Sequence, residues 1–175
     1  MISFEPCRIC ENSKAKIPGY LEVDVGGITH YKECSCHVKW RTQSLYMDKA
    51  LKAGLYAVTN KNHVAQEIFN SLDNYNPDKD YRGSHSLDSL NKLKILINNF
   101  DNYEFNSSIF YMYGSAGTQK TSLAKWVGLS LIKKGFSVQY LRMNQLITDL
   151  MPNFDDPVDK QVIDSYYHTD LLILD

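Results

Sequence analysis

A glycine-rich turn between a strand-like run and a helix-like run constrains the fold of this chain more than any other feature. The turn is GSAGTQKT at 114–121; it follows the apolar SIFYMY at 108–113 and precedes a helical pattern that ends at Gly135. In such a cradle, backbone N–H groups, a lysine and a hydroxyl at the helix start bind phosphate oxygens and Mg²⁺. The alternative is an ordinary strand-to-helix turn with a lysine at its end.

Each role in this cradle has an occupant, although one position departs from the pattern G-x-x-x-x-G-K-[ST]. Gln119 stands where the last glycine belongs, and a residue with a Cβ does not easily adopt positive φ. Its side chain must point out of the loop, and a side chain there is tolerable if Gln119 has ordinary helical dihedral angles. Lys120 would contact the β- and γ-phosphates. The predicted nucleotide-binding residues are Gly114, Ser115, Ala116, Gly117, Thr118, Gln119, Lys120 and Thr121.

A second motif, which ends in an acidic residue, follows at the end of the sequence. The apolar run Leu171–Leu174 predicts a buried strand, and Asp175 comes directly after it. In ATPases with a phosphate loop, a carboxylate at a strand end holds Mg²⁺ through water. Thr121 and Asp175 are therefore the predicted magnesium residues. The alternative is a buried strand that ends in a polar turn.

Strand-like and helix-like segments alternate after about residue 84. Helical patterns at 86–100, 121–134, 144–150 and 158–167 are interleaved with strand patterns at 108–113, 136–141 and 170–175. This alternation predicts a parallel sheet with crossover helices, the α/β class. We expect three regions: 1–54, a small module of a hairpin and a helix; 55–84, a helix and linker; and 85–175, the phosphate-loop domain.

All four cysteines lie in the first region, in two pairs at either end of a predicted hairpin that turns at Gly26-Gly27. In a reducing compartment, two close pairs favour metal over disulfide, and four thiolates complete a tetrahedral Zn²⁺ shell. We predict structural zinc in preference to free thiols or a disulfide, with His37 or His30 able to replace one thiolate. The predicted zinc ligands are Cys7, Cys10, Cys34 and Cys36.

Composition excludes several classes of protein. The 19 Lys and Arg residues nearly balance 20 Asp and Glu residues, for a net charge of −1, so no global basic field points to a protein that coats nucleic acid. No apolar run is long enough for a membrane span, and the first residues do not resemble a signal peptide. We expect no membrane partner and a cytoplasmic protein.

Residues 80–175 resemble the AAA+ ATPases that load the replicative helicase in bacteria and their phages. These are the DnaC-like and DnaI-like loaders, and the IstB-like transposition helpers are close relatives. Besides the phosphate loop and Asp175, the resemblance rests on Leu123-Ala124, on Gly135-Phe136-Ser137-Val138, on Leu146 and Leu150, on Asn99-Phe100 and on Tyr81-Arg82-Gly83.

The resemblance implies a parallel-sheet AAA+ domain that binds ATP or ADP with Mg²⁺, and an N-terminal module that binds the helicase and often holds zinc. It also implies contacts with single-stranded DNA and self-association of AAA+ domains. A later strand, which carries a polar sensor residue, would separate the strand before Asp175 from the phosphate-loop strand. Because that strand, the general base and the arginines that act across subunits would follow Asp175, we expect a chain truncated after this strand, with an incomplete hydrolytic site.

The leading functional hypothesis is therefore an ATP-binding helicase loader that helps to place the replicative helicase on single-stranded DNA during replication initiation. One alternative is a non-hydrolysing interaction or inhibitory module that acts on a host helicase or loader. Another is a transposition-helper ATPase, which the resemblance makes less favoured because those proteins usually begin with a helical module without this cysteine pattern.

Overall fold

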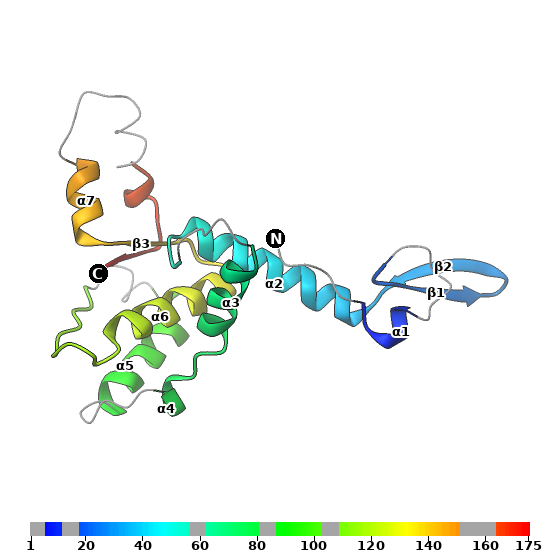
Figure 1. Ribbon diagram of the computed structural model, residues 1–175, viewed down its shortest axis with the longest axis horizontal. Helices are drawn as coiled ribbons and strands as arrows, with labels where there is room; N and C mark the ends of the chain where they lie inside the picture. The colour runs from blue at the N-terminus through cyan, green and yellow to red at the C-terminus, as the bar shows by residue number, and fades with distance from the viewer. Residues whose placement is uncertain (1–5, 12–17, 57–61, 81–86, 103–108, 151–163) are drawn as a thin grey trace. The chain divides into compact units, whose positions relative to one another are not determined.

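The computed structural model of the chain describes two compact units, Met1–Asp48 and Lys49–Asp175, each with its own internal contacts. In Figure 1 the first unit runs from blue to cyan and the second from cyan to red. The residues described are 6–11, 18–56, 62–80, 87–102, 109–150 and 164–175.

The first unit contains the short helix α1 (Arg8–Glu11), the strands β1 (Tyr20–Val25) and β2 (Ile28–Glu33), and most of helix α2 (Ser35–Lys52). The strands pair antiparallel with Val25 opposite Ile28, which confirms the predicted hairpin. Gly26 and Gly27 both have positive φ, 64° and 82°, as a tight two-residue hairpin turn requires.

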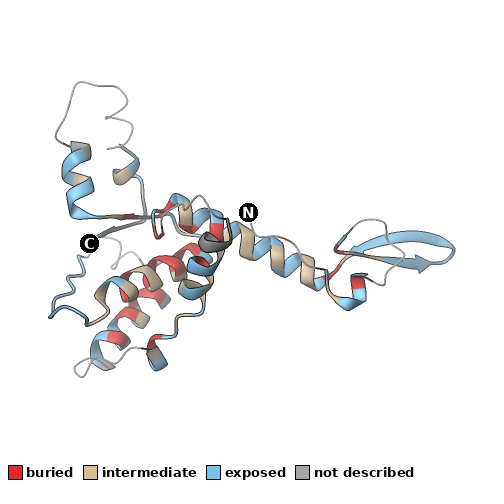
Figure 2. Cartoon of the chain, in the orientation of Figure 1, coloured by how far each residue is buried: buried red, intermediate tan, exposed pale blue. Residues whose placement is uncertain are grey.

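The first unit buries little apolar surface. Figure 2 shows the hairpin almost entirely exposed, and the buried apolar side chains among the described residues of this unit are Cys10, Cys34 and Met47. A unit this small, with two cysteines among its few buried residues, needs a stabilising cross-link or metal to hold one structure.

The second unit has the α/β character that the alternating pattern predicts. It contains α3 (Asn62–Asp73), α4 (Pro77–Asp80), α5 (Leu87–Asn98), α6 (Lys120–Lys134), β3 (Val138–Leu141), α7 (Met143–Leu150) and β4 (Leu171–Leu174). The strands β3 and β4 pair in parallel, with Val138 opposite Leu171. Residues 164–167 are helical, whereas the rest of the helix predicted at 158–167 lies outside the described residues.

Helix α6 is the centre of the second unit, where α3, α5 and β3 pack on it (Figure 1). Its buried residues recur at helical spacing, and Gly128 lets β3 and β4 approach closely: a Cβ there would lie 3.1 Å from Ile173 and 3.3 Å from Val138. The helix ends at Gly135, whose φ of 103° and amide bonds to the carbonyls of Leu131 and Ile132 form a C-terminal cap. This packing positions the first turn of α6 beside the ends of the strands.

The prediction of a strand at 108–113 is wrong for residues 109–113, the part that the structure describes. Residues 109–113 are not assigned to a strand, and Ile109, Tyr111 and Tyr113 are 96%, 84% and 84% exposed rather than in the core. The sequence has strong β propensity, but a strand also needs hydrogen-bonding neighbours. Among the described residues the parallel sheet consists of β3 and β4, and 109–113 pairs with neither.

The contact division after Asp48 falls within helix α2, before the boundary predicted at 54. The predicted regions 1–54, 55–84 and 85–175 stay predictions. The residues around the second boundary, 81–86, lie outside the described residues.

Candidate functional site

The glycine-rich loop closes around the side chain of Lys120 at the start of α6. The ammonium of Lys120 donates to the carbonyl oxygens of Gly114 and Ser115, at 2.9 and 2.8 Å, and to Oγ1 of Thr118 at 3.2 Å. The hydroxyl of Thr118 in turn donates to the carbonyl of Ser115, at 2.8 Å. The loop therefore places a positive charge in its concave face, where a phosphate group would be attracted.

Gln119 does not have the ordinary helical dihedral angles that would make a side chain at this position tolerable. Its φ and ψ are 58° and 22°, the left-handed conformation, which costs a residue with a Cβ about 1–2 kcal/mol. Gln119 therefore adopts the backbone conformation for which glycine is suited. Its side-chain oxygen accepts a hydrogen bond of 3.1 Å from the hydroxyl of Tyr75, in the segment between α3 and α4.

The start of α6 has the character of an anion site. Gln119 is the N-cap residue, yet its side chain makes no capping hydrogen bond to the helix. The amides of the first turn point toward the loop, and the helix dipole favours negative charge there.

Thr121 and Asp175 meet although 54 residues separate them in sequence. The hydroxyl of Thr121 lies 3.1 and 3.0 Å from the two carboxylate oxygens of Asp175. Asp175 follows β4 at the carboxyl end of the parallel pair, the edge at which ligands of α/β folds bind. A hydroxyl beside a carboxylate fits the oxygen ligands and water-mediated contacts that Mg²⁺ prefers.

Tyr140 is a third member of this cluster, which sequence reasoning missed. It lies on β3 opposite Ile173, and its hydroxyl donates to Oδ2 of Asp175. Burial raises the pKa of Tyr140 above its ordinary value, and the hydrogen bond to the carboxylate raises it further. The phenol therefore stays protonated and acts as a donor. Its position on a strand adjacent to β4 was the available signal.

Lys125 lies on the same side of α6, one turn after Thr121. Its ammonium is 5.0 Å from the centre of the Tyr140 ring, a cation–π arrangement. Burial lowers the pKa of Lys125, the positive charge of Arg142 lowers it further, and Asp175 opposes both effects. The spacing of four residues from Thr121 to Lys125 places both on one helix face, which sequence reasoning could have noted.

A cavity of about 170 Å³ lies between α3 and the first turns of α6, and a larger one of about 380 Å³ lies at the amino end of β3. The smaller cavity mixes apolar side chains with a few polar groups, including Ser122 and Lys125. The larger cavity borders residues 136–139, at the opposite end of β3 from Asp175, and neither cavity is lined by residues 114–121, so the candidate site rests on the loop contacts and on the Thr121–Asp175 pair.

The four cysteines of the first unit converge. The Sγ–Sγ distances are 3.8 Å for Cys7 to Cys10, 3.6 Å for Cys7 to Cys34 and 3.4 Å for Cys10 to Cys36, and all four sulfur atoms lie within 4.8 Å of one another. A tetrahedral zinc with Zn–S bonds of about 2.3 Å separates its sulfur ligands by about 3.8 Å. The cluster thus has the dimensions of a four-cysteine metal site, and the backbone N–H groups of Cys10 and Ile9 lower the pKa of the Cys7 thiol to about 6.

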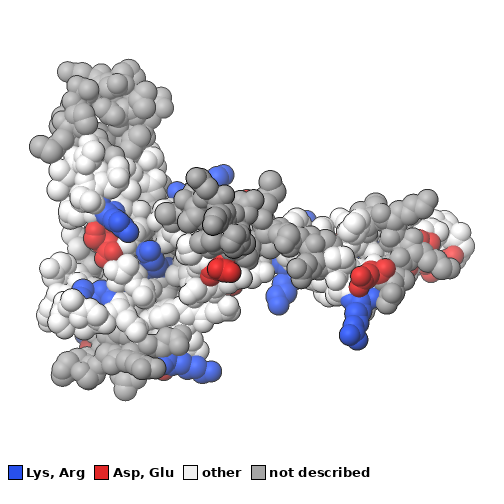
Figure 3. Space-filling view, viewed as in Figure 1, with Lys and Arg blue, Asp and Glu red and all other residues white. Residues whose placement is uncertain are grey.

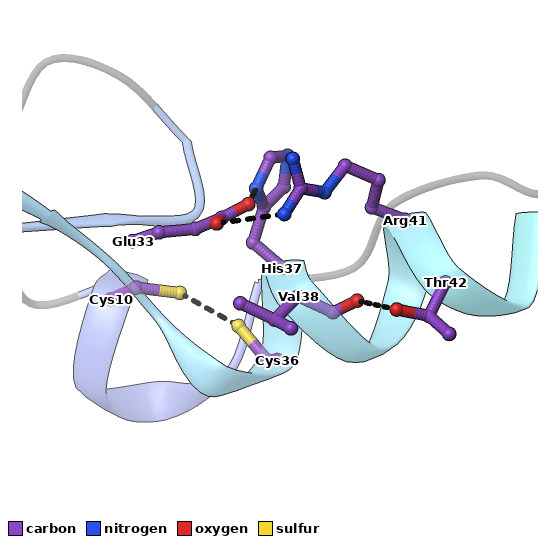
Figure 4. Close-up of polar contacts among 7 residues, drawn as sticks. All are labelled: Cys10, Glu33, Cys36, His37, Val38, Arg41 and Thr42. Atoms are coloured by element: carbon purple, nitrogen blue, oxygen red, sulfur yellow. Dashed lines mark hydrogen bonds and ion pairs between the residues drawn. The ribbon is translucent and has the colours of Figure 1, made fainter.

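The two histidines considered as replacement ligands are not part of this cluster. In Figure 4, His37 turns toward Glu33, and its Nδ1 lies 2.7 Å from the carboxylate, which Arg41 also contacts at 3.2 Å. The ring of His37 stacks on Trp40, with centroids 5.3 Å apart. His30 lies in the exposed part of β2, opposite Val23. The donor set that the described residues bring together is four sulfur atoms.

Comparison of the sequence with models of known protein families gave a match. The sequence model of the family described as "IstB-like ATP binding protein" matches residues 77–175, more than half of the chain. The chain belongs to this family of IstB-like ATP-binding proteins. Comparison with curated proteins and with solved structures gave no match.

Family membership makes the second unit of this IstB-like protein an ATP-binding domain of the AAA+ type. The match begins at Pro77, the first residue of α4, and contains the whole loop and Asp175. The helices that the structure describes include none with the length and apolarity to cross a membrane.

Proposed function

We propose that this IstB-like protein is a helicase loader, in which ATP binding by the second unit controls how the protein engages a replicative DNA helicase. The observation that carries the proposal is the combination, on one chain, of a four-cysteine cluster and an ATP-binding domain. The resemblance described above associates that combination with loaders rather than with transposition helpers. ATP would act mainly as a switch, through unequal affinity for two states of the protein.

In this proposal the loop residues 114–119 surround the phosphates of ATP or ADP with their amides, and Lys120 contacts the β- and γ-phosphates. Thr121 and Asp175, whose side-chain oxygens lie 3.0 and 3.1 Å apart, would be the residues that hold Mg²⁺. The bound ion would neutralise phosphate charge. Tyr140 would help to orient the carboxylate, because its hydroxyl donates to Oδ2, an oxygen that Thr121 also contacts.

The cysteine cluster would hold Zn²⁺ as a structural ion. Four thiolates leave no position for water, so the ion would stabilise the first unit rather than catalyse a reaction. A zinc-stabilised hairpin with exposed strands, continued by α2, is the surface that we propose contacts the helicase. Single-stranded DNA and neighbouring copies of the chain would contact the ATP-binding unit. Figure 3 shows charges of both signs interspersed on the face in view rather than one basic patch, so any DNA contact there would be local.

Nucleotide binding is tested by titrating the protein with a fluorescent ATP analogue, with and without Mg²⁺. We expect Mg²⁺-dependent binding that Lys120→Ala weakens at least tenfold, because the main phosphate-binding charge is lost. The matched control is Lys92→Ala, which removes an exposed lysine paired with Asp88 four residues away. Equal affinities for the two variants would contradict the assigned role of the loop.

Helicase loading is tested by size-exclusion chromatography of the protein with the purified replicative helicase of its host, in ATP and in ADP. Co-elution that depends on the nucleotide supports the proposal. No complex in either nucleotide would overturn it.

A transposition helper is the second candidate, because the matching family is described by its IstB-like members. Nucleotide-dependent binding to a transposase, with no binding to the helicase, would favour this function. A non-hydrolysing inhibitory module is the third candidate. It would bind helicase or loader equally well with ATP, with ADP and with neither.

A further inference from the structure

Gln119 occupies an unusual backbone conformation at the position that joins the phosphate loop to helix α6. Among the described residues it is the one non-glycine residue with positive φ, at 58°. It directly precedes Lys120 and Thr121, so its dihedral angles determine where both side chains begin. A conformation of this kind persists when the surrounding structure holds it.

Tyr75 contacts the side chain of this residue: its hydroxyl donates to the side-chain oxygen of Gln119 over 3.1 Å. Both side chains are half-buried, so water competes less for this hydrogen bond than it would at an exposed site. Glutamine is long enough to reach out of the loop, whereas the glycine of the usual pattern offers no side chain to hold.

Tyr75 is itself anchored in a short corner between α3 and α4. Its amide donates to the carbonyl of Leu72, and the side chain of Asn76 accepts from the amide of Asp78 at the start of α4. Asp78 also pairs with Lys94 of α5, at 2.6 Å. The corner is thus connected to the helices on both sides and is a firm base for a contact with the loop.

Tyr75 also lies next to the candidate nucleotide site, because it contacts Gln119 of the loop. It lines a cavity with Ser122 and Lys125 of α6, the residues that follow the loop. A movement of the corner would therefore reach the loop directly through this hydrogen bond.

We propose that Tyr75 is a positioning residue of the phosphate loop, which holds Gln119 in its left-handed conformation and so keeps the loop ready for nucleotide. The inference rests on the proposed nucleotide site and deepens it. It makes a distinctive prediction: Tyr75 matters for nucleotide affinity only while residue 119 carries a side chain that can accept its hydrogen bond.

The test is a double-mutant cycle of Tyr75→Phe and Gln119→Gly, with ATP affinity measured in Mg²⁺. Loss of one partly buried hydrogen bond predicts that Tyr75→Phe weakens binding by roughly 3–10-fold. Gln119→Gly removes the clamp and the strain together, so we expect a change below about threefold. In the double variant, Tyr75→Phe should add less than about twofold. Equal losses in both backgrounds would overturn the inference, because Tyr75 would then act without Gln119.

A second readout separates this inference from the proposed function. Without nucleotide, hydrogen exchange of the amides at 118–122 should be faster in Tyr75→Phe than in the wild type. In the Gln119→Gly background, adding Tyr75→Phe should not change the exchange rate. Faster exchange in a protein that binds no ATP would support the clamp and reject the nucleotide site. Unchanged exchange and affinity in Tyr75→Phe would reject the clamp. The matched control is Tyr31→Phe, an exposed tyrosine of β2, which should alter neither readout.

Discussion

Gly54 offers a sharp test of how the second unit packs beside its candidate site. The residue follows α2 with a φ of 74°, and a Cβ placed on it would lie 2.7 Å from the carbonyl oxygen of Tyr140. The amide of Tyr140 donates to the carbonyl of Ala53, at 2.8 Å. The chain at 53–54 thus covers the edge of β3, the strand whose tyrosine hydroxyl contacts Asp175.

The substitution Gly54→Ala combines two costs. Left-handed φ costs alanine about 1–2 kcal/mol, and the overlap with a backbone oxygen adds about 1–3 kcal/mol because a strand edge cannot yield as a flexible side chain would. The sum is about 2–5 kcal/mol. For a unit of this size, each kcal/mol lowers the unfolding midpoint by about 3–5 °C.

The control is Gly135→Ala, in the same unit. Gly135 has a φ of 103°, but nothing lies within 4 Å of a Cβ placed there, so only the backbone cost applies. Thermal unfolding is followed by tryptophan fluorescence in a Trp40→Phe background, where Trp126 of α6 reports on the second unit alone. We expect Gly54→Ala to unfold at a clearly lower temperature than Gly135→Ala. Equal midpoints would refute the close approach of Gly54 to β3.

Three further predictions concern the candidate sites. Tyr140→Phe should weaken Mg²⁺-dependent ATP binding by about 3–10-fold, because Asp175 loses a hydrogen-bond donor that orients it. ATP binding in EDTA should change little. Equal losses of affinity in both conditions would reject the role of Tyr140 in orienting Asp175. Because folding raises the pKa of Tyr140, its contribution to stability is complete below the ordinary tyrosine pKa of about 10 and is lost as pH rises through the pKa of the folded protein. In urea unfolding, the free energy of unfolding of the wild type should therefore fall more steeply above about pH 10 than that of Tyr140→Phe. Metal analysis should find one zinc per chain. Cys10→Ser or a strong chelator should unfold the hairpin, as followed by circular dichroism, without lowering the thermal unfolding midpoint that Trp126 reports. A metal-free protein with an intact hairpin would contradict the zinc site.

Local features of this protein could be predicted from the sequence because their causes are local. The hairpin follows from two glycines between alternating residues, and Gly26 and Gly27 do adopt the positive φ that the turn needs. Helix α6 follows from its apolar period and from Gly135 at its end. The apolar run before Asp175 predicts β4, and its parallel partner β3 follows from the helix between them.

The two wrong expectations both depended on neighbours that are distant in sequence. The run before the loop has the composition of a strand, yet 109–113 is exposed because composition does not supply a hydrogen-bonding partner. At Gln119 the Cβ disfavours positive φ, so the sequence argued against the left-handed conformation. The observed left-handed angles accompany a hydrogen bond from Tyr75, 44 residues earlier in the chain.

By itself, the sequence of this IstB-like protein determined which chemical groups are present and their local conformational preferences: a lysine and a hydroxyl at a helix start, a carboxylate after an apolar strand, and two cysteine pairs around a hairpin. Only the tertiary structure decided that these groups meet. Thr121 reaches Asp175 because α6 packs on the parallel pair β3 and β4, and the sulfur atoms converge because the hairpin returns the chain to α1. Distances between residues far apart in sequence depend on packing of the whole unit, which no local pattern encodes.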